Sequence, residues 1–273
     1  MRIAVLSGKG GAGKTTVSIH LAKLLGYAYV DCDVEEPNGF LFMEPEIQDS
    51  QDIRVWVPSI DHSKCDVCKA CLANCQFNAI GFNGRQMLVF EHLCHSCQAC
   101  LLSCTKDAIT SNYRSIGIIN MGNSQGTTCY EGRLNIGEPM GGPIIEELIK
   151  VSPDEAIIDC PPGSSCNVVK ANKRTDLAVV VAEPTLFSRH NLHIVVSFLK
   201  EQRIPIGVVI NKAGEGDEII EEYCSDKAIP LLGKIPFSRG LSKEFSKGHI
   251  IQDDHPIMND YQAIAKELRS LMK

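Results

Sequence analysis

The sequence predicts an α/β fold, in which a mainly parallel sheet carries helices on both faces and a cysteine-rich insert interrupts the chain. Apolar stretches typical of buried strands recur along the sequence and alternate with helical patterns, which predicts the sheet. The insert is predicted by composition, since eight of the thirteen cysteines lie between Asp61 and Ser111. We therefore expect one domain made of residues 1–60 and 112–273, with a small α+β module inserted at residues 61–111.

The N-terminal elements follow the order strand, glycine loop, helix, strand. Arg2–Leu6 is a short apolar run of the buried-strand kind, and Tyr27–Val30 is a second one. Between them, Thr15–Leu25 places its apolar residues at helical spacing. Residues 54–60 are expected to form a further strand that breaks at Pro58.

The alternation of strands and helices resumes after Ser111. Strands are expected at Ala156–Asp159, Leu177–Ala182, Ile206–Ile210 and Leu231–Ile235. Helices are expected near residues 143–150, 187–203, 216–227 and 257–271. The last of these is amphipathic but mixes acidic and basic residues, so docking onto the core is expected rather than membrane binding.

A phosphate-binding loop lies between the first strand and the first helix. Residues 8–15 read Gly-Lys-Gly-Gly-Ala-Gly-Lys-Thr and satisfy G-x-x-x-x-G-K-[ST]. Such a loop turns its N–H groups around phosphate oxygens, Lys14 reaches the β- and γ-phosphates, and the Thr15 hydroxyl binds Mg²⁺. ATP and Mg²⁺ are therefore the expected ligands. The expected nucleotide contacts are Gly10, Gly11, Ala12, Gly13, Lys14, Thr15 and Thr16.

A second lysine in this loop, Lys9, makes the motif resemble the deviant Walker motif of the MinD/ParA ATPases, which include Mrp-type carriers and the nitrogenase iron protein. The resemblance implies that Lys9 contacts the nucleotide of a partner subunit, in an ATP-dependent homodimer. By itself, a solvated loop lysine is the simpler interpretation.

Three more segments resemble the same family. Val30-Asp31-Cys32-Asp33, followed by Glu36-Pro37-Asn38, is similar to its switch I segment, which implies that Asp33 activates the attacking water. Residues 157–163 are similar to its Walker B and switch II segment, with Asp159 supporting the Mg²⁺ shell. Residues 208–212 are similar to its adenine-contacting segment, where Asn211 would bond the base. The resemblance implies ATP hydrolysis that is slow and stimulated by a partner.

The cysteines of the insert form two copies of one pattern. Cys65, Cys68, Cys71 and Cys75 have the spacing C-x₂-C-x₂-C-x₃-C, and a second run repeats it 29 residues later at Cys94, Cys97, Cys100 and Cys104. Asn78-Ala79-Ile80 also matches Asp107-Ala108-Ile109 at this offset, which indicates a duplication.

This spacing is that of bacterial two-cluster ferredoxins, where the fourth cysteine of each run serves the other cluster. Two [4Fe–4S] clusters are therefore expected, one on Cys65, Cys68, Cys71 and Cys104 and one on Cys94, Cys97, Cys100 and Cys75. Zinc is the alternative, although zinc sites usually pair two separated C-x-x-C knuckles. Gln76 and Thr105 stand where the ferredoxin pattern has proline, which leaves the local geometry and potential open.

The other cysteines are expected to be structural. Cys32, Cys129 and Cys224 are most simply small buried hydrophobes. Cys160 and Cys166 flank the switch II turn, where the nitrogenase iron protein holds a cluster between subunits. Ordinary packing is the simpler interpretation of both.

Charge and hydropathy limit the binding partners and the cellular location that we expect. The net charge of −6 gives no indication of a nucleic-acid or anionic-membrane surface, and no window has the ~18 apolar residues of a membrane helix. No stretch resembles a signal peptide, so a cytoplasmic location is expected, where thirteen cysteines indicate metal rather than disulfides.

Three functions remain open on the sequence. The favoured one is a nucleotide-dependent dimer switch coupled to electron transfer, since eight ligands describe two fully coordinated clusters. An ATPase that assembles or carries iron–sulfur or other metal clusters is the first alternative. A redox-sensing positioning ATPase of the MinD/ParA kind is the second. The partner is accordingly an unidentified redox or cluster-acceptor protein.

Overall fold

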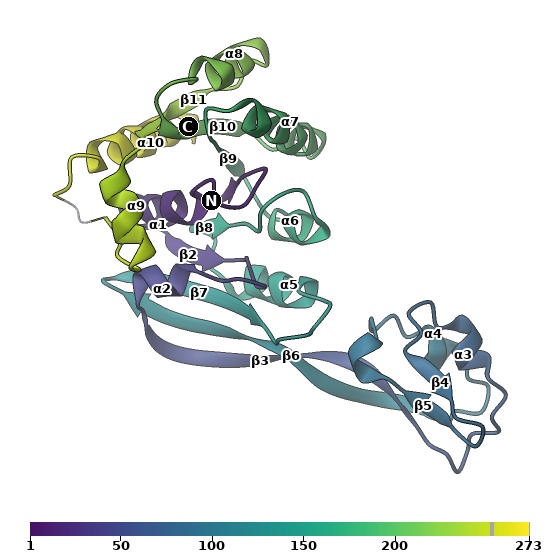
Figure 1. Ribbon diagram of the computed structural model, residues 1–273. Coiled ribbons are helices and arrows are strands. Elements are labelled where there is room, and N and C mark those ends of the chain that lie inside the picture. Colours follow the sequence, from purple (N-terminus) through teal and green to yellow (C-terminus); the bar gives the residue numbers. More distant parts are fainter. Residues whose placement is uncertain (252–253, 273) are drawn as a thin grey trace. The chain divides into compact units, whose positions relative to one another are not determined.

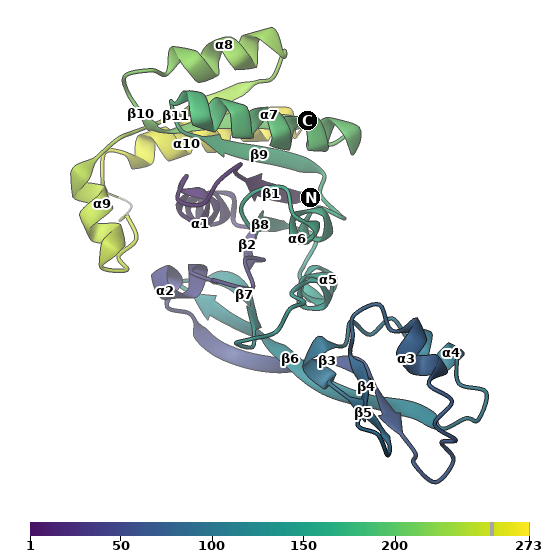
Figure 2. The ribbon, with the colours of Figure 1, turned by 45° about the vertical axis from the view of Figure 1, so that its right-hand side comes forward.

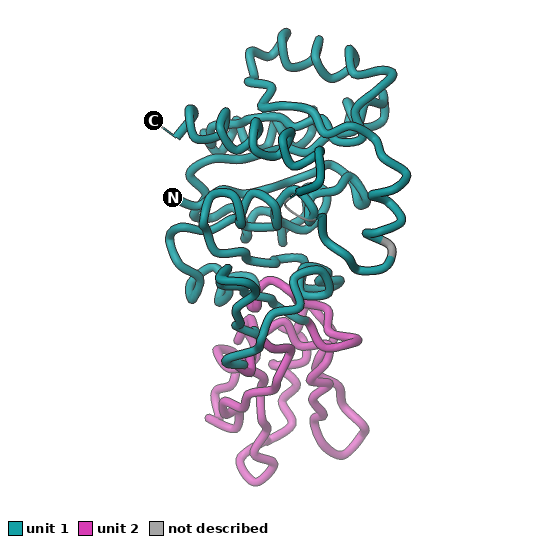
Figure 3. Tube along the Cα trace, turned by 90° about the vertical axis from the view of Figure 1, so that its left-hand side faces the viewer, with its two compact units in different colours: residues 1–50, 119–133, 145–273 teal, residues 51–118, 134–144 magenta. Residues whose placement is uncertain are grey.

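The computed structural model describes residues 1–251 and 254–272 and divides into two compact units (Figure 3). The first unit consists of Met1–Ser50, Ile119–Arg133 and Ile145–Lys273, and the second of Gln51–Ile118 and Leu134–Ile144. The second unit contains all of the expected insert at residues 61–111. Its boundaries lie further out because two long strands continue from the sheet into it.

A nine-stranded sheet runs through the described residues in the order β11-β10-β9-β1-β8-β2-β7-β6-β3. All six neighbouring pairs from β11 to β7 are parallel. Their bounds are β1 Arg2–Leu6, β2 Ala28–Asp31, β7 Thr127–Leu134, β8 Ala156–Asp159, β9 Leu177–Ala182, β10 Ile206–Ala213 and β11 Leu231–Pro236. The mainly parallel sheet is thus confirmed, and the predicted strands that correspond to β1, β2, β8, β9, β10 and β11 each start within one residue of the observed strand.

The far edge of the sheet was predicted only in part, as a strand at residues 54–60. It is formed by β3, at Glu46–Ile60, and β6, at Ile109–Ser124 (Figure 2). Cross-strand bonds join Trp56 to Ser111 and Asp61 to Ala108, so residue numbers rise on one strand as they fall on the other and the pair is antiparallel. The predicted break at Pro58 was wrong, because proline lacks only a donor and an edge strand can leave that position unpaired.

Helices cover both faces of the parallel part of the sheet (Figure 1). On one face lie α1 (Lys14–Leu25) and α10 (Met258–Leu271), and on the other lie α5 (Gly142–Val151), α6 (Cys166–Ala171) and α7 (Leu186–Glu201). This arrangement confirms the α/β fold with a mainly parallel sheet and helices on both faces. The remaining helices of this unit are α2 (Gly39–Met43), α8 (Glu218–Asp226) and α9 (Arg239–Ser246).

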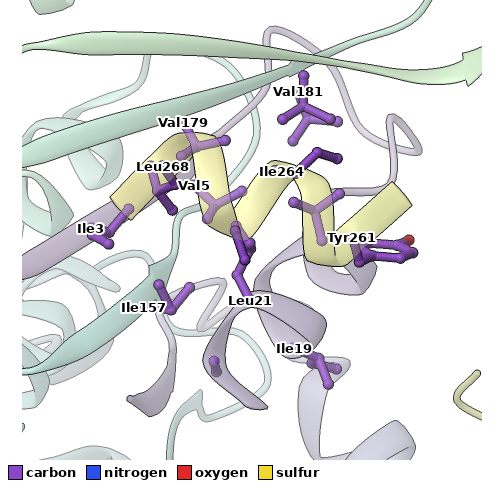
Figure 4. Packing of buried hydrophobic residues seen from close by; sticks show 14 of the residues in the cluster. Ile3, Val5, Ile19, Leu21, Ile157, Val179, Val181, Tyr261, Ile264 and Leu268 are labelled. Atoms are coloured by element: carbon purple, nitrogen blue, oxygen red, sulfur yellow. The ribbon is translucent and has the colours of Figure 1, made fainter. Parts of the chain in front are cut away.

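The core of the first unit lies between the sheet, α1 and α10. Ile3, Leu21 and Val179 are buried there from three different elements (Figure 4). Ile264 and Leu268 of α10 are fully buried in the same cluster. The expectation that the C-terminal helix docks onto the core is therefore confirmed.

The second unit holds only short elements beyond its two long strands. They are α3 (Ala70–Asn74), β4 (Ile80–Phe82), β5 (Met87–Val89), the 3₁₀ helix η1 (Glu91–Leu93) and α4 (Ala99–Leu102). A small core of Trp56, Ile80, Met87, Cys100 and Ile109 holds them together. The Asp61 N–H donates to the Ala108 carbonyl at 2.7 Å, which closes the base of this cysteine-rich segment.

Candidate functional site

The phosphate loop connects β1 to α1 as the sequence predicted. Gly13 has φ of 90°, a left-handed conformation that favours glycine, and its carbonyl accepts the first helical bond from Val17. A Cβ at Gly13 would lie 2.1 Å from the Asn211 side-chain nitrogen. Asn211, on β10, donates a hydrogen bond from that nitrogen to the Ala12 carbonyl at 2.8 Å, so it supports the loop from a strand two places away from β1 in the sheet.

A surface hollow opens beside this loop. Gly11, Gly13, Thr16 and Asn211 line it, together with residues that were not expected to contact the nucleotide. Those residues are Lys212, Ile235, Pro236, Phe237, Ser238, Leu241, Ser242, Phe245 and Tyr261. The hollow thus combines polar loop groups with aromatic and apolar side chains, which suits a nucleoside base.

Lys14 and Asp159 meet at the end of β8. Their Nζ and Oδ1 atoms are 3.8 Å apart, and both side chains are buried. The Tyr29 hydroxyl donates to Asp159 Oδ2 at 3.0 Å, whereas Oδ1 has no hydrogen-bond partner within the described chain. A buried carboxylate oxygen that makes no hydrogen bond is costly, so a cation such as Mg²⁺ fits this position beside Lys14.

Asp31 is a site residue that sequence reasoning missed. It ends β2 at the position in register with Asp159 on β8, which brings two buried carboxylates side by side. It accepts hydrogen bonds from the N–H groups of Asp33 at 3.0 Å and Gly39 at 2.9 Å. Burial and the Asp159 charge raise the pKa of Asp31 to about 8. The available signal was an aspartate ending an apolar strand, as Asp159 also does.

Asp33 lies beside this carboxylate pair. Burial raises its pKa to about 6 against the opposing charge of Lys14. The structure therefore brings Lys14, Asp31, Asp33 and Asp159 together from three segments that are distant in sequence. A carboxyl group with a raised pKa near neutrality is suited to proton transfer.

Lys9 forms an ion pair within its own chain. Its Nζ contacts Oε2 of Glu183, a buried residue that follows β9 and that the sequence analysis did not single out. Lys212 binds the other oxygen of Glu183 at 2.5 Å and donates to the Gly11 carbonyl at 3.1 Å. Burial tends to raise the pKa of Glu183, but the two lysines outweigh it and the pKa lies below its ordinary value.

The cysteines of the second unit surround two separate hollows. The first hollow is lined by Cys65, Cys68, Cys71 and Cys104. The second hollow is lined by Cys75, Cys94, Cys97 and Cys100. Each hollow is thus lined by three cysteines of one run and the fourth cysteine of the other run.

The backbone around the hollows repeats with the sequence. Left-handed φ angles occur at Val67, Lys69 and Asn78 and again 29 residues later at Ser96, Gln98 and Asp107. Such angles turn successive N–H groups toward one side, as in many iron–sulfur sites. Ala79 N–H approaches Cys75 Sγ at 3.3 Å and Ser96 N–H approaches Cys94 Sγ at 3.4 Å, so the loops supply donors to thiolates.

The donor set fits two four-iron clusters. Within the described residues, no group of three or more His, Cys, Asp or Glu side chains is arranged to hold a single metal ion. In a four-iron cluster each thiolate binds its own iron, so four sulfur atoms around a hollow need not converge on one point. The described cysteines are all free thiols.

The other cysteines lie mainly in the interior. Cys32, Cys129 and Cys224 are buried, as expected of small apolar residues. Cys160 is fully buried, which raises its thiol pKa, and its side chain is thus enclosed within its own subunit. Cys166 is exposed at the start of α6.

Among the described helices, none combines the length and hydropathy needed to cross a bilayer.

The protein is similar to known proteins along most of its length. Residues 3–251 match the family described as the CobQ/CobB/MinD/ParA nucleotide binding domain. Uncharacterized protein MJ0578 of Methanocaldococcus jannaschii is 38% identical over 78% of this chain and 79% of that protein.

Two further similarities are more distant. The cytosolic Fe-S cluster assembly factor Nubp1 homolog of Drosophila sechellia is 24% identical over 90% of this chain and 74% of that protein. The septum site-determining protein MinD of Pyrococcus horikoshii, solved with Mg-ADP, has a TM-score of 0.62 at 19% identity and is covered over 96%, against 99% of this chain. The fold, the phosphate loop and the family match agree, and the chain belongs to the CobQ/CobB/MinD/ParA family of nucleotide-binding proteins.

Proposed function

We propose that this protein is an ATP-hydrolysing iron–sulfur protein, in which a nucleotide-dependent dimer is coupled to electron transfer through two [4Fe–4S] clusters. The observation that carries the proposal is the presence, in one chain, of a MinD-type phosphate loop and of two hollows lined by four cysteines each. The first part binds and hydrolyses ATP, and the second takes up single electrons.

The nucleotide chemistry rests on the loop and on the carboxylates beside it. Backbone N–H groups of the glycine loop and Lys14 hold the phosphates, while Thr15 and Asp159 complete the Mg²⁺ shell. Asp33 orients the attacking water and accepts its proton. Two observations support these roles: Oδ1 of Asp159 makes no hydrogen bond within the described chain, and the pKa of Asp33 is raised.

Dimer formation depends on Lys9 in this proposal. MgATP draws Lys9 away from Glu183 and toward the phosphates of the nucleotide in the partner subunit. Glu183 then keeps Lys212, which still contacts the Gly11 carbonyl. The nucleotide therefore changes which charges the phosphate loop presents at its surface.

The eight cysteine thiolates hold the clusters, which supply one-electron redox chemistry when bound. The N–H groups of Ala79 and Ser96 stabilise the negative charge on two of these sulfurs. The redox partner is a protein that exchanges single electrons with the second unit.

A cluster assembly or carrier ATPase is the second candidate. The similarity to a cytosolic Fe-S cluster assembly factor favours it, although the match is at 24% identity. Clusters that transfer readily to an apo-protein distinguish this candidate from an electron carrier. A redox-sensing positioning ATPase is the third candidate. In that case the binding of the protein to a cellular surface depends on the oxidation state of the clusters.

The test is anaerobic purification followed by iron analysis and EPR of the reduced protein, with and without MgATP. We expect about eight irons per chain, as two four-iron clusters require. MgATP should change the reduction rate or the spectrum in the wild type and should have no effect in Lys14→Ala. Lys23→Ala, on the same helix but outside the phosphate loop, is the matched control.

Iron close to zero would refute the cluster proposal. Full clusters that do not respond to MgATP would refute the coupling. Transfer of those clusters to an apo-ferredoxin would then favour the assembly candidate.

A further inference from the structure

The two cysteine hollows share one duplicated framework but differ in the side chains around it. Nearly every residue that lines the first hollow has its equivalent, 29 positions away in the sequence, among the residues that line the second. The charged residues of the first lining are Asp66, Lys69 and Lys106, and the second hollow has His95, Gln98 and Phe77 at the equivalent positions. Three charged groups are thus replaced by an imidazole, an amide and a phenyl ring.

The same difference extends to the residues just before each run of cysteines. Before the first run, Lys64 and Asp61 form a solvent-exposed ion pair at 3.9 Å. Their equivalents before the second run are Leu93 and Phe90, which are 49% and 47% exposed. The Leu93 N–H donates to the Phe90 carbonyl at 3.0 Å in a 3₁₀ turn, where residues three apart lie on the same side. An ion pair is therefore replaced by two exposed apolar side chains.

A second ion pair is replaced in the same way. Asp66 and Lys106 are joined at 3.6 Å at the first hollow, and both side chains are about half exposed. The equivalent His95 and Phe77 stack instead, with their ring centroids 3.9 Å apart, and Phe77 is 39% exposed. We call Phe77, Phe90 and Leu93 the apolar rim of the second hollow.

The apolar rim has the composition of a binding surface. Residues 90–104 contain one Asp, Glu, Lys or Arg, whereas the equivalent residues 61–75 contain four. Exposed aromatic and aliphatic side chains without interspersed charges are typical of the centre of a protein interface. A charged group of a partner would lose its hydration there without gaining an ion pair, so the rim favours an uncharged docking face.

The position of the rim indicates which kind of protein covers it. In the proposed function the second hollow holds a cluster, and a protein that exchanges electrons with this cluster must bring its own redox centre to the mouth of the hollow. Complexes between electron-transfer proteins have small interfaces, for which a few exposed side chains suffice. A redox protein therefore fits both the place and the size of the rim.

We propose, on the basis of the two-cluster function above, that the apolar rim is the docking surface for a redox protein whose own centre is surrounded by uncharged side chains, and that electrons pass between the two proteins at the second hollow. One electron leaves the reduced carrier and reduces the oxidised cluster, and no bond forms or breaks. The charged side chains around the first hollow stay hydrated in this complex.

The experiment is anaerobic stopped-flow spectrophotometry of the full-length protein with two single-electron carriers, a reduced ferredoxin and a flavodoxin hydroquinone. At least one carrier should reduce the wild type with a rate that saturates as the carrier concentration rises. Its second-order rate constant should change less than about twofold between about 0.05 M and about 0.5 M NaCl, because salt screens charges and not apolar contacts.

The duplication supplies matched variants. Phe77→Gln/Leu93→Gln removes two apolar side chains at the second hollow and should lower the rate constant about tenfold. Lys106→Gln/Lys64→Gln introduces glutamine at the equivalent positions of the first hollow and should stay within about twofold of wild type. Leu93→Met keeps the apolar contact and should behave as wild type. Reduction by dithionite requires no docking surface and should be the same in all variants.

A tenfold loss in Lys106→Gln/Lys64→Gln, or a rate constant that falls steeply with salt, would place the carrier at the charged side chains and overturn the inference. Equal rates in the two double variants would overturn it as well. So would a wild type that dithionite reduces and neither carrier reduces.

Iron content separates these outcomes from other failures. If Phe77→Gln/Leu93→Gln binds less iron than wild type, Leu93→Gln alone replaces it, because Leu93 is half exposed and lines neither hollow. Its rate constant should fall about threefold, and an unchanged value would contradict the inference. A wild type that fails to bind about eight irons refutes the proposed function instead, so the two failures are distinguishable.

Discussion

At the scale of single residues, the nucleotide site contains more charge than the motifs account for. Asp31 and Asp159 end neighbouring parallel strands in register, and both are buried beside Lys14. Glu183 lies between Lys9 and Lys212. Each of these contacts can be tested by removing one charge.

The first residue-scale prediction concerns pH. The folded-state pKa of Asp31 is raised to about 8, so its stabilising contribution is complete below the unfolded-state value near 4 and is lost as the pH rises toward 8. In Mg²⁺-free, nucleotide-free protein, the melting temperature of Asp31→Asn relative to wild type should therefore increase by several degrees between about pH 5 and pH 8. Thermal unfolding followed by circular dichroism measures this difference.

Asp154→Asn is the control for that prediction, because the Asp154 side chain is 94% exposed. Its melting temperature should follow that of wild type at every pH. A difference between Asp31→Asn and wild type that does not change with pH contradicts the raised pKa.

The second residue-scale prediction concerns dimer formation. Glu183 and the nucleotide phosphates compete for Lys9 if Lys9 acts across the interface. Glu183→Gln should then increase the dimer fraction severalfold at subsaturating MgATP, measured by analytical ultracentrifugation, and Lys9→Ala should abolish the dimer. Glu215→Gln, which removes an exposed carboxylate, should behave as wild type. Weaker dimerisation of Glu183→Gln would show that Glu183 instead supports the interface.

At the scale of elements, the turn between β6 and β7 fixes the edge of the sheet. Gln125 and Gly126 have φ of 51° and 86°, the two left-handed angles of a type I′ turn. A Cβ at Gly126 would meet nothing within 4 Å, so only backbone conformation disfavours a side chain there.

Substitutions at the two residues of this turn should change the free energy of unfolding differently. Gly126→Ala should lower the free energy of unfolding by roughly 1 kcal/mol, because an L-residue is disfavoured in the left-handed region. Gln125→Gly should raise it or leave it unchanged, since it relieves the same strain. Urea denaturation measures both variants. Equal destabilisation by the two changes would mean that side-chain contacts, not backbone angles, control the turn.

At the scale of the whole molecule, the cysteine-rich segment at residues 62–107 begins and ends at neighbouring points of the strand pair β3 and β6, and His92 also contacts Glu138. The chain enters it after Asp61 and leaves it before Ala108, and these residues share a backbone hydrogen bond. Segments with adjacent ends can often be removed without unfolding the remainder.

We therefore predict that residues 62–107 can be replaced by Asn-Gly, which closes β3 and β6 as a two-residue hairpin. The shortened protein should bind no iron and retain MgATP binding within about threefold of the full chain, measured by isothermal titration calorimetry. Replacement of residues 121–128, which removes the β6–β7 turn of the sheet, is the comparison that should unfold the protein. Loss of nucleotide binding on removal of residues 62–107 would contradict the assignment of separate roles to the two parts.

The local chemistry of this protein can be predicted from short segments of its amino-acid sequence. The glycine loop, the strand-ending Asp159 and the duplicated cysteine spacing each lie within a few residues of chain, and their backbone geometry follows from local propensities and short-range hydrogen bonds. The parallel sheet was predictable for the same reason, since apolar strands that alternate with helices have few other ways to bury their surface.

The tertiary structure decided which distant groups meet. The Asp31–Asp159 pair depends on the placement of β2 beside β8, and Glu183 reaches Lys9 because β9 lies beside β1. The long strands β3 and β6 contain polar runs at residues 48–52 and 110–112, so periodicity indicated only residues 54–60 of this pair, and mutual pairing forms the rest of the edge. Arg114 and Glu138 form an ion pair from separate segments, whose burial no sequence pattern signals. Strand order and burial arise from packing of the whole chain, which is why these contacts could be found only in the folded protein.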